Sequence, residues 1–310
     1  MATAIPPLSD FEKLEFGTVQ SQLIAGYDSS KLVLASYNIR YAVGRFLISS
    51  GLLRKLGVGG NQKRAQQVGE NIRRTAEIFT TNKLMPLPDV VALQEADKRT
   101  ARAGAHHVAR ELAEAMKISW VHAPAGIPRG QPPVPRQWWL DFEEQIGLHD
   151  AGDTGVALLS RFPLEEVTRI DLPWHECPWR PRLAMAATIS LNKKKLRILN
   201  AHVDPHAAVG GQLEQLEMLV AEAEKHSGPT LVVGDFNTLS RNKCAETRGF
   251  MEARGFQTPI PTGTPTWRGA GIRLHADWIF YRDLKITNWG VARPLNVSDH
   301  WPIWAEIDVE

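Results

Sequence analysis

The chain of 310 residues has only two cysteines, Cys177 and Cys244, and this scarcity excludes a fold held together by disulfide bonds. Neither lies in a Cys-x-x-Cys pair or at zinc spacing from a histidine, so we expect both to be structural or without a role. The chain also lacks an apolar run near the ~18 residues that a membrane-spanning helix needs, and its start lacks the layout of a signal peptide. We therefore expect a cytoplasmic protein without a transmembrane segment.

A strong excess of charge of one sign is absent as well. The 36 basic and 34 acidic residues give a formal net charge of +2, whereas many dedicated nucleic-acid binders are strongly basic. The charge balance therefore permits a phosphate-bearing substrate without arguing for one. An apolar content of 43% and a charged content of 23% are ordinary for a soluble protein with a large core, arranged as one large domain or two small ones.

Short apolar runs that suit β-strands recur along the chain. They span residues 31–39, 89–95, 119–124, 154–160, 182–190, 196–203, 230–236, 276–282 and 302–308. Between some of them, apolar residues at helical spacing predict amphipathic helices around residues 65–79, 108–116 and 213–223. At least nine strands and about three helices predict a mixed α/β protein, and no repeat period is visible.

No Ser/Gly-rich or Pro-rich linker divides the chain, so we predict a single domain over residues 31–310 that follows an N-terminal extension, residues 1–30. Two stretches interrupt the pattern and are predicted to be loop inserts. Residues 44–64 mix apolar, glycine and basic residues, and residues 123–153 combine prolines with Trp138 and Trp139, which are too apolar for a free linker. Both inserts could border a substrate site or form surface loops with a small cluster of their own.

Polar side chains stand at the ends of six of the predicted strands. They are Asn38, Glu95, His202, Asp235 with Asn237, Asp277, and Asp299 with His300. One such residue commonly caps a turn or a helix, but six suggest that the strand ends converge on one cleft. Amide and carboxylate oxygens are ligands that suit Mg²⁺ or Mn²⁺, and histidines exchange protons near neutral pH. Such groups together are what the hydrolysis of a phosphate ester needs.

Seven segments in order resemble the motif series of the endonuclease/exonuclease/phosphatase superfamily, over about residues 31–308. They are SYNIR, PDVVALQE, TGVALLSRFPL, NAHVD, VVGDFN, HADWIFYR and SDHWPIW. Members of this superfamily include deoxyribonucleases, abasic-site endonucleases, neutral sphingomyelinases, deadenylases and inositol polyphosphate phosphatases. The resemblance implies an α/β fold, a four-layer α/β/β/α sandwich of two mainly antiparallel sheets flanked by helices.

The resemblance also implies a metal site and the groups around the scissile phosphate. Asn38 and Glu95 match residues that bind the essential Mg²⁺ or Mn²⁺, and Asp299 matches one near that metal. Asp235 would orient or deprotonate the attacking water, or protonate the leaving group, and Asn237 would donate a hydrogen bond to the phosphate. These last two residues could also contribute to a second metal site. The alternatives are a turn residue for Asn38 and a helix N-terminal carboxylate for Glu95.

Two histidines complete the implied catalytic set. His300 would contact a phosphate oxygen or act as a base, and Asp277 would pair with it and fix its tautomer, unless Asp277 only caps a strand. His202 stands where abasic-site endonucleases carry Tyr, so the sequence resembles the deoxyribonuclease, sphingomyelinase and deadenylase branches instead. There a histidine stabilises the phosphate or protonates the leaving oxygen, and Asp153 is a candidate for the acidic residue that supports it. A core histidine bound to backbone is the alternative for His202.

Further substrate contacts are predicted around the cleft, at Arg40, Arg182, Trp267, and Arg268 or Arg273. Arg40 matches a phosphate-contacting arginine, and the other arginines could bring positive charge to the rim. Trp267 lies where relatives place an aromatic residue against the substrate, although a packing role is an equal alternative. His106 and His107 match no motif and are interpreted as surface residues.

The matched residues specify phosphoester hydrolysis better than they specify the substrate. We predict a metal-dependent phosphodiesterase, an endonuclease or exonuclease acting on DNA or RNA. A lipid or small-molecule phosphoesterase is the alternative, with Trp138 and Trp139 available for a lipid interface. A catalytically silent binding protein fits less well because every matched position is filled. The predicted partner is thus a phosphodiester substrate, and no protein partner can be inferred.

Overall fold

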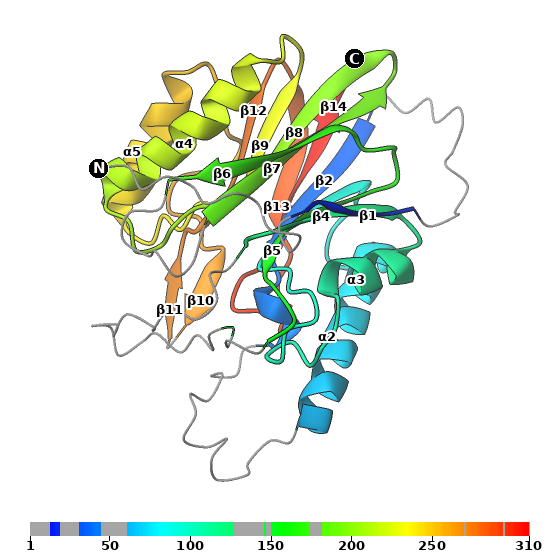
Figure 1. Ribbon diagram of the computed structural model, residues 1–310. Coiled ribbons are helices and arrows are strands. Elements are labelled where there is room, and N and C mark those ends of the chain that lie inside the picture. The colour runs from blue at the N-terminus through cyan, green and yellow to red at the C-terminus, as the bar shows by residue number, and fades with distance from the viewer. Residues whose placement is uncertain are drawn as a thin grey trace.

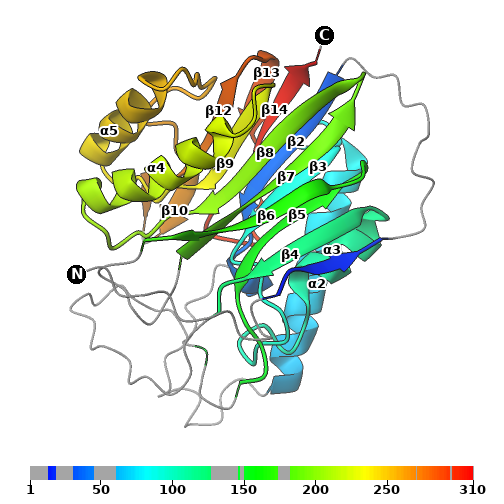
Figure 2. The same cartoon turned by 45° about the horizontal axis from the view of Figure 1, so that its top comes forward.

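Two β-sheets packed face to face form the body of the protein, and helices cover the outer face of each sheet (Figures 1 and 2). The computed structural model describes residues 13–18, 31–44, 61–126, 146, 150–173, 182–269, 271–293 and 295–309. Most of the two predicted loop inserts, with Trp138 and Trp139, therefore lies outside the described residues, as does Cys177. Among the described helices, none has the length and apolar content to span a membrane.

The larger sheet has seven strands, and all its neighbouring pairs are antiparallel except β2 with β3. Its order is β1 (Glu15–Gly17), β4 (Ser119–Pro124), β5 (Gly155–Ser160), β3 (Val90–Gln94), β2 (Lys31–Asn38), β14 (Ile303–Asp308) and β13 (Lys285–Val291). Strand β1 belongs to the predicted N-terminal extension and adds an edge strand to this sheet, a point that the sequence left open.

The second sheet has five strands, and only β8 and β9 run parallel. Its order is β12 (Asp277–Arg282), β9 (Thr230–Asp235), β8 (Lys194–His202), β7 (Arg182–Leu191) and β6 (Glu165–Leu172). A separate hairpin joins β10 (Trp267–Gly269) to β11 (Ile272–Leu274). The helices are α2 (Asn61–Thr81), α3 (Val108–Met116), α4 (Val209–Glu224) and α5 (Arg241–Glu252), with a one-turn 3-10 segment, η2, at Arg40–Ala42.

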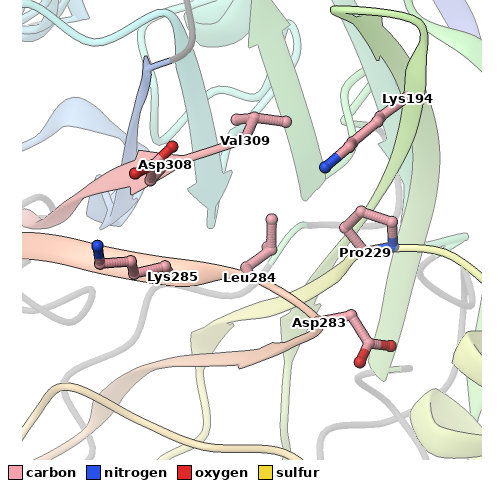
Figure 3. A pocket seen from close by; sticks show the side chains of 7 residues that line it. All are labelled: Lys194, Pro229, Asp283, Leu284, Lys285, Asp308 and Val309. Atoms are coloured by element: carbon pink, nitrogen blue, oxygen red, sulfur yellow. The ribbon is translucent and has the colours of Figure 1, made fainter.

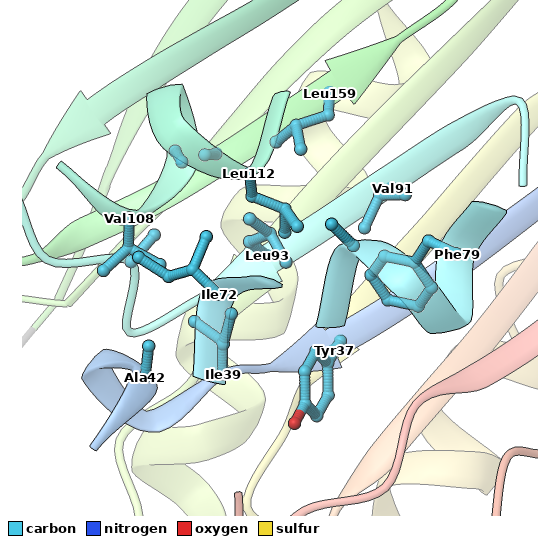
Figure 4. Packing of buried hydrophobic residues seen from close by; sticks show 14 of the residues in the cluster. Tyr37, Ile39, Ala42, Ile72, Phe79, Val91, Leu93, Val108, Leu112 and Leu159 are labelled. Carbon is cyan, nitrogen blue, oxygen red and sulfur yellow. The ribbon is translucent and has the colours of Figure 1, made fainter. Parts of the chain in front are cut away.

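Alternation along the strands divides the apolar residues among three layers of core. On β2, Leu32 and Leu34 face the other sheet, whereas Ala35 and Tyr37 face α2 and α3, because successive strand side chains point to opposite sides. Figure 4 shows the layer beneath α2 and α3, where Tyr37, Phe79 and Leu112 pack together. A third cluster lies between the five-stranded sheet and α4 and α5. The predicted four-layer sandwich is therefore confirmed.

Some elements depart from the sequence-based expectations. Strands β6 and β13 were not predicted because they lie at sheet edges, where half-exposed sequences such as EEVTRIDL show no apolar run. Helix α5 was missed because only Cys244, Thr247 and Met251 are buried among its charged residues. The insert predicted at 44–64 is wrong at its end, since helix α2 already begins at Asn61.

Candidate active site

Three strand ends of the five-stranded sheet lie side by side and carry polar side chains. His202 is the last residue of β8, Asp235 the last of β9 and Asp277 the first of β12. The strand register pairs His202 with Asp235 and Asp235 with Asp277. Gly234 allows β9 to run this close, because a Cβ at this position would lie 2.0 Å from the Ala201 carbonyl oxygen.

The seven-stranded sheet brings a second set of residues to the same end of the sandwich. Asn38 ends β2, Glu95 follows β3, and His300 lies shortly before β14. The Asn38 amide donates a hydrogen bond of 2.9 Å to Oδ2 of Asp235, which links the two sheets at a buried point. The polar strand ends that the sequence singled out are thus brought together across both sheets.

His300 lies between two buried carboxylates. Its Nδ1 is 2.9 Å from Oδ2 of Asp277, and its Nε2 is 3.7 Å from Oδ2 of Asp235. Ser298 holds the segment in place, because its hydroxyl donates to the Asn38 carbonyl at 2.8 Å and accepts from the His300 backbone N–H at 3.1 Å. No role was predicted for Ser298 from the sequence, although it is the first residue of the SDH motif.

Burial and neighbouring charges shift the pKa values of Asp235 and His300. Burial is the main cause that raises the pKa of Asp235, the charge of Asp277 raises it further, and His300 opposes the shift. Burial alone would lower the pKa of His300, but Asp277 and Asp235 together outweigh it and raise that pKa above its ordinary value. The positively charged imidazolium is therefore the favoured form of His300 at neutral pH.

His202 occupies the other side of Asp235. Its Nε2 lies 3.6 Å from Oδ2 of Asp235 and 3.7 Å from Oε1 of Glu95. Nη1 of Arg182, a buried side chain at the start of β7, lies 3.0 Å from the same Nε2. The side chain of Asp153 accepts hydrogen bonds from the backbone N–H groups of Gly126 and Thr154, at 3.0 and 2.8 Å. The structure thus places Arg182 against His202, beside the catalytic set rather than on the rim.

Asp299 is fixed by two residues that the sequence assigned to substrate binding. Its Oδ2 accepts a hydrogen bond of 3.1 Å from Nε1 of Trp267 and lies 3.6 Å from Nε of Arg40. The backbone N–H of Arg40 also donates to Oδ1 of Asn38 at 3.0 Å. Arg40 and Trp267 therefore orient Asp299, and Arg40 also orients Asn38, both of which are predicted to lie at the metal. Any contact of Arg40 or Trp267 with the substrate would be additional.

Asn237 lies just beyond the end of β9. Its side-chain amide donates to the Val203 carbonyl at 2.8 Å, and its backbone N–H donates to Oδ1 of Asp235 at 2.9 Å. One amide hydrogen remains for a further acceptor, because a side-chain amide has two. Asn237 thus both orients Asp235 and keeps a donor.

The donor atoms at this end of the sandwich suit a hard divalent cation. One ligand atom each from Asp235, Asp277 and His300 lies within 4.8 Å of the others, and Oδ1 of Asp277 is buried without a hydrogen-bond partner among the described residues. Asn38, Glu95 and Asp299 add further oxygen donors at the same end of the sandwich. A set so rich in oxygen fits Mg²⁺ or Mn²⁺ better than zinc.

His107 contradicts its interpretation as a surface residue. It is 2% exposed, and its Nε2 lies 3.0 Å from Oε2 of Glu15 on strand β1. Its Nδ1 accepts a hydrogen bond from the Arg110 backbone N–H and so caps helix α3. Burial is the largest cause that lowers the pKa of His107. The side chain is thus structural, and the partner that reveals this lies 92 positions away in the sequence.

A pocket of about 400 Å³ lies at the opposite end of the strands (Figure 3). It is lined by Lys194, Pro229, Asp283, Leu284, Lys285, Asp308 and Val309. Lys194 begins β8, the strand that ends at His202, so the length of this strand separates the pocket from the candidate site. Its two lysines and two aspartates balance each other and form no part of the catalytic group.

Comparison with known proteins gives a family match over most of the chain. The model of the Endonuclease/Exonuclease/phosphatase family matches residues 35–300. A UPF0294 protein of Photorhabdus laumondii is 28% identical over 141 residues, which cover 42% of this chain and 53% of that protein. A UPF0294 protein of Yersinia enterocolitica gives a similar match, 28% identical over 144 residues. The chain thus spans about half the length of the curated relatives that it matches.

Solved structures share the fold at low sequence identity. An endonuclease/exonuclease/phosphatase from Beutenbergia cavernae has a TM-score of 0.60 and 14% identity, covering 90% of this chain and 71% of that one. D. rerio TDP2, solved in complex with a single-strand DNA product, has a TM-score of 0.56 and 16% identity, covering 90% of this chain and 99% of that one. These similarities support the same sandwich fold.

Proposed function

The chain belongs to the endonuclease/exonuclease/phosphatase family, and on this premise we propose that it is a divalent-metal-dependent phosphodiesterase that acts on nucleic acid. The observation that carries the proposal is the position of His300, whose two ring nitrogens face Asp277 and Asp235 at 2.9 and 3.7 Å. A buried imidazolium between carboxylates, beside a set of oxygen donors, supplies the charge and proton transfer that a phosphodiester requires.

The metal and the histidine have separate places in this proposal. A divalent cation, which neutralises charge on the phosphate oxygens, would be held by Asn38, Glu95 and Asp299. Asp277 accepts the Nδ1 proton of His300 and so leaves the Nε2 proton free to face a phosphate oxygen. We therefore assign Asp277 and His300 to an acid–base dyad rather than to the metal.

Asp235 is the proposed base for the attacking water. Its raised pKa, caused mainly by burial, makes its carboxylate a stronger base than an ordinary aspartate. Asn38 and Asn237 hold its two oxygens through hydrogen bonds of 2.9 Å each, which fix the direction of proton transfer. His202 and the buried Arg182 would stabilise negative charge on the phosphate from the other side.

Two points support nucleic acid as the substrate class. D. rerio TDP2, which shares the fold, has been solved with a single-strand DNA product. Three arginines of this chain also gather around Trp301, the residue that follows His300, and would favour a charged strand there. The lipid alternative depends on Trp138 and Trp139, which lie outside the described residues.

The test is hydrolysis of bis(p-nitrophenyl) phosphate and of DNA and RNA oligonucleotides, with and without Mg²⁺ or Mn²⁺. We expect metal-dependent hydrolysis, and near-complete loss in Asp235→Asn and His300→Ala. Asp308→Asn, in the pocket at the other end of the strands, is the matched control and should keep wild-type activity. Full activity in either site variant, or activity unchanged by a chelator, would contradict the proposal.

A further inference from the structure

Three arginines surround one tryptophan next to the proposed catalytic histidine. The guanidinium carbons of Arg268, Arg273 and Arg293 lie 4.7, 6.0 and 4.8 Å from the ring centre of Trp301. Arg268 and Arg273 are directly opposite each other in the β10–β11 hairpin, so their side chains share one face. The hairpin and the segment after β13 thus bring three positive charges to one aromatic ring.

Two of these charges have no acidic partner. Within the described part of the chain, neither Arg273 nor Arg293 forms an ion pair with a carboxylate, and Arg268 is bound to the Leu295 carbonyl and to Asn296 at 2.7 Å each. Burial, and then the charge of Arg273, lower the pKa of Arg293. The guanidinium groups of Arg273 and Arg293 repel each other, and Arg293 also donates to the Pro265 carbonyl, so both positive charges remain uncompensated and suit an anion.

Backbone contacts join this surface to the candidate active site. Trp301 directly follows His300, and its backbone N–H donates to the Thr266 carbonyl at 2.8 Å. The next residue, Trp267, forms an isolated β-bridge with His300 and donates to Asp299 through its indole. Arg268 thus directly follows Trp267, which pairs with His300, Arg273 lies opposite Arg268 in the hairpin, and Arg293 lies on the segment after β13.

We propose that Arg273 and Arg293 bind the phosphate next to the scissile one in a nucleic-acid strand. The proposal rests on the proposed function and narrows it, because it requires a substrate with at least two phosphates in a row. Guanidinium groups are suited to this role, since each can donate two parallel hydrogen bonds to one phosphate. A lipid phosphodiester with a single phosphate would leave this pair unused.

The kinetic test compares substrates with and without a neighbouring phosphate. Arg273→Ala and Arg293→Ala should lower kcat/KM for a thymidine tetranucleotide by about tenfold each, the scale of one lost charged contact. The same variants should leave bis(p-nitrophenyl) phosphate and the dinucleotide TpT unchanged. A neutral methylphosphonate in place of the neighbouring phosphate should lower the wild-type rate and remove the difference between wild type and variant.

The matched control removes two positive charges at the far pocket, with Lys194→Ala and Lys285→Ala together, and should not affect the tetranucleotide. Equal loss on the tetranucleotide and on TpT would overturn the proposal. A lower rate with an inositol polyphosphate alone would also overturn it, because Arg273 and Arg293 would then bind a small substrate with several phosphates. The unfolding temperature of Arg273→Ala should equal or exceed that of the wild type, because a like-charge contact is relieved, whereas Arg273→Lys keeps the charge and should leave the temperature unchanged.

A binding measurement separates this proposal from the proposed function. Fluorescence anisotropy in a His300→Ala background follows a labelled oligothymidylate at several salt concentrations without turnover. Loss of each phosphate contact should reduce the slope of log K against log[salt] by about 0.7 for a single strand. If the wild type hydrolyses none of these substrates and the arginine variants still reduce the slope, the proposed function is refuted and the phosphate site stands. An unchanged slope in an active enzyme would refute the phosphate site alone.

Discussion

Asp277→Asn tests the central interaction of the candidate site. The substitution keeps the shape of the side chain but removes its charge, and it allows the amide to donate toward Nδ1 of His300. The Nδ1 atom lies 2.9 Å from Oδ2 of Asp277, and both side chains are almost fully buried. An asparagine that donates here would leave the His300 proton on Nε2 but would no longer stabilise the imidazolium.

The size of the effect follows from the lost charge. A hydrogen bond to a charged group contributes about 1.5–3 kcal/mol. Because both side chains are buried, water screens the charge of Asp277 only weakly, and the upper end of this range applies. Taking about 3 kcal/mol as the loss, and about 1.4 kcal/mol per factor of ten, kcat should fall by about 100-fold. The pH profile should also shift. Because Asp277 raises the pKa of His300, its removal lowers that pKa, and the protonated form is lost at a lower pH.

The assay is the pH dependence of kcat for bis(p-nitrophenyl) phosphate at saturating Mg²⁺ or Mn²⁺. Asp283→Asn, at an exposed position just past the end of β12, is the control for the same chemical change. A variant within threefold of the wild type would refute the assigned dyad. A fall in kcat with an unmoved alkaline limit would show that Asp277 acts otherwise than by raising the pKa of His300.

The remaining predictions concern stability and the metal. Asn200→Ala should lower the free energy of unfolding by about 4 kcal/mol in urea, because it removes buried hydrogen bonds to Leu93, Ala157 and Gln94 of 2.9, 2.9 and 2.7 Å. Burial lowers the pKa of His275 from 6.5 to about 4, so stability should be complete above pH 6.5 and fall by about 3 kcal/mol as the pH drops toward 4. His275→Gln should flatten that slope, and an unchanged slope would exclude this cause. A chelator should abolish hydrolysis. Added Mg²⁺ or Mn²⁺ should restore it, whereas buffer without a divalent metal should not.

The sequence was sufficient to predict the layers of the fold because each central strand is buried on both faces. Runs such as those of β2, β3 and β9 are mainly apolar up to their polar ends, and their Val and Leu content indicates strands without any tertiary information. The edge strands could not be found in this way. Strand β13 has exposed residues on much of its length, and its pairing with β14 comes from the fold rather than from its own pattern.

The candidate site was predictable to the extent that it is built from strand ends. The register of β8, β9 and β12 aligns His202, Asp235 and Asp277, and strand ends are visible in a sequence as polar residues after apolar runs. Contacts between distant side chains were not predictable. Arg182 reaches His202 because β7 pairs with β8, and the three arginines reach Trp301 from the β10–β11 hairpin and the segment after β13. The local sequence does not indicate these pairings.

Backbone strain at the strand ends connects the core to the candidate site. Glu95 and Asn237 have φ values of 52° and 51°, and Arg40, Tyr41 and Ala42 have 46°, 56° and 59°, a left-handed region that costs about 1–2 kcal/mol per residue. Two hydrogen bonds offset this backbone strain. The Tyr41 backbone N–H donates to the Glu95 carbonyl at 3.0 Å, and the Asn71 amide of α2 donates to the Ala42 carbonyl at 2.8 Å.

These hydrogen bonds connect the packing of helix α2 to the position of Glu95. Figure 4 shows Ala42 and Ile39 beside Ile72 of α2, so the strained turn rests on the apolar layer beneath that helix. The guanidinium of Arg102 lies 3.4 Å above the Tyr41 ring and closes the turn from the other side. Because the Tyr41 backbone N–H donates to the Glu95 carbonyl, a change that loosens this layer releases strain first at Glu95. The proposed metal-side residues should therefore lose their geometry before the sandwich itself unfolds.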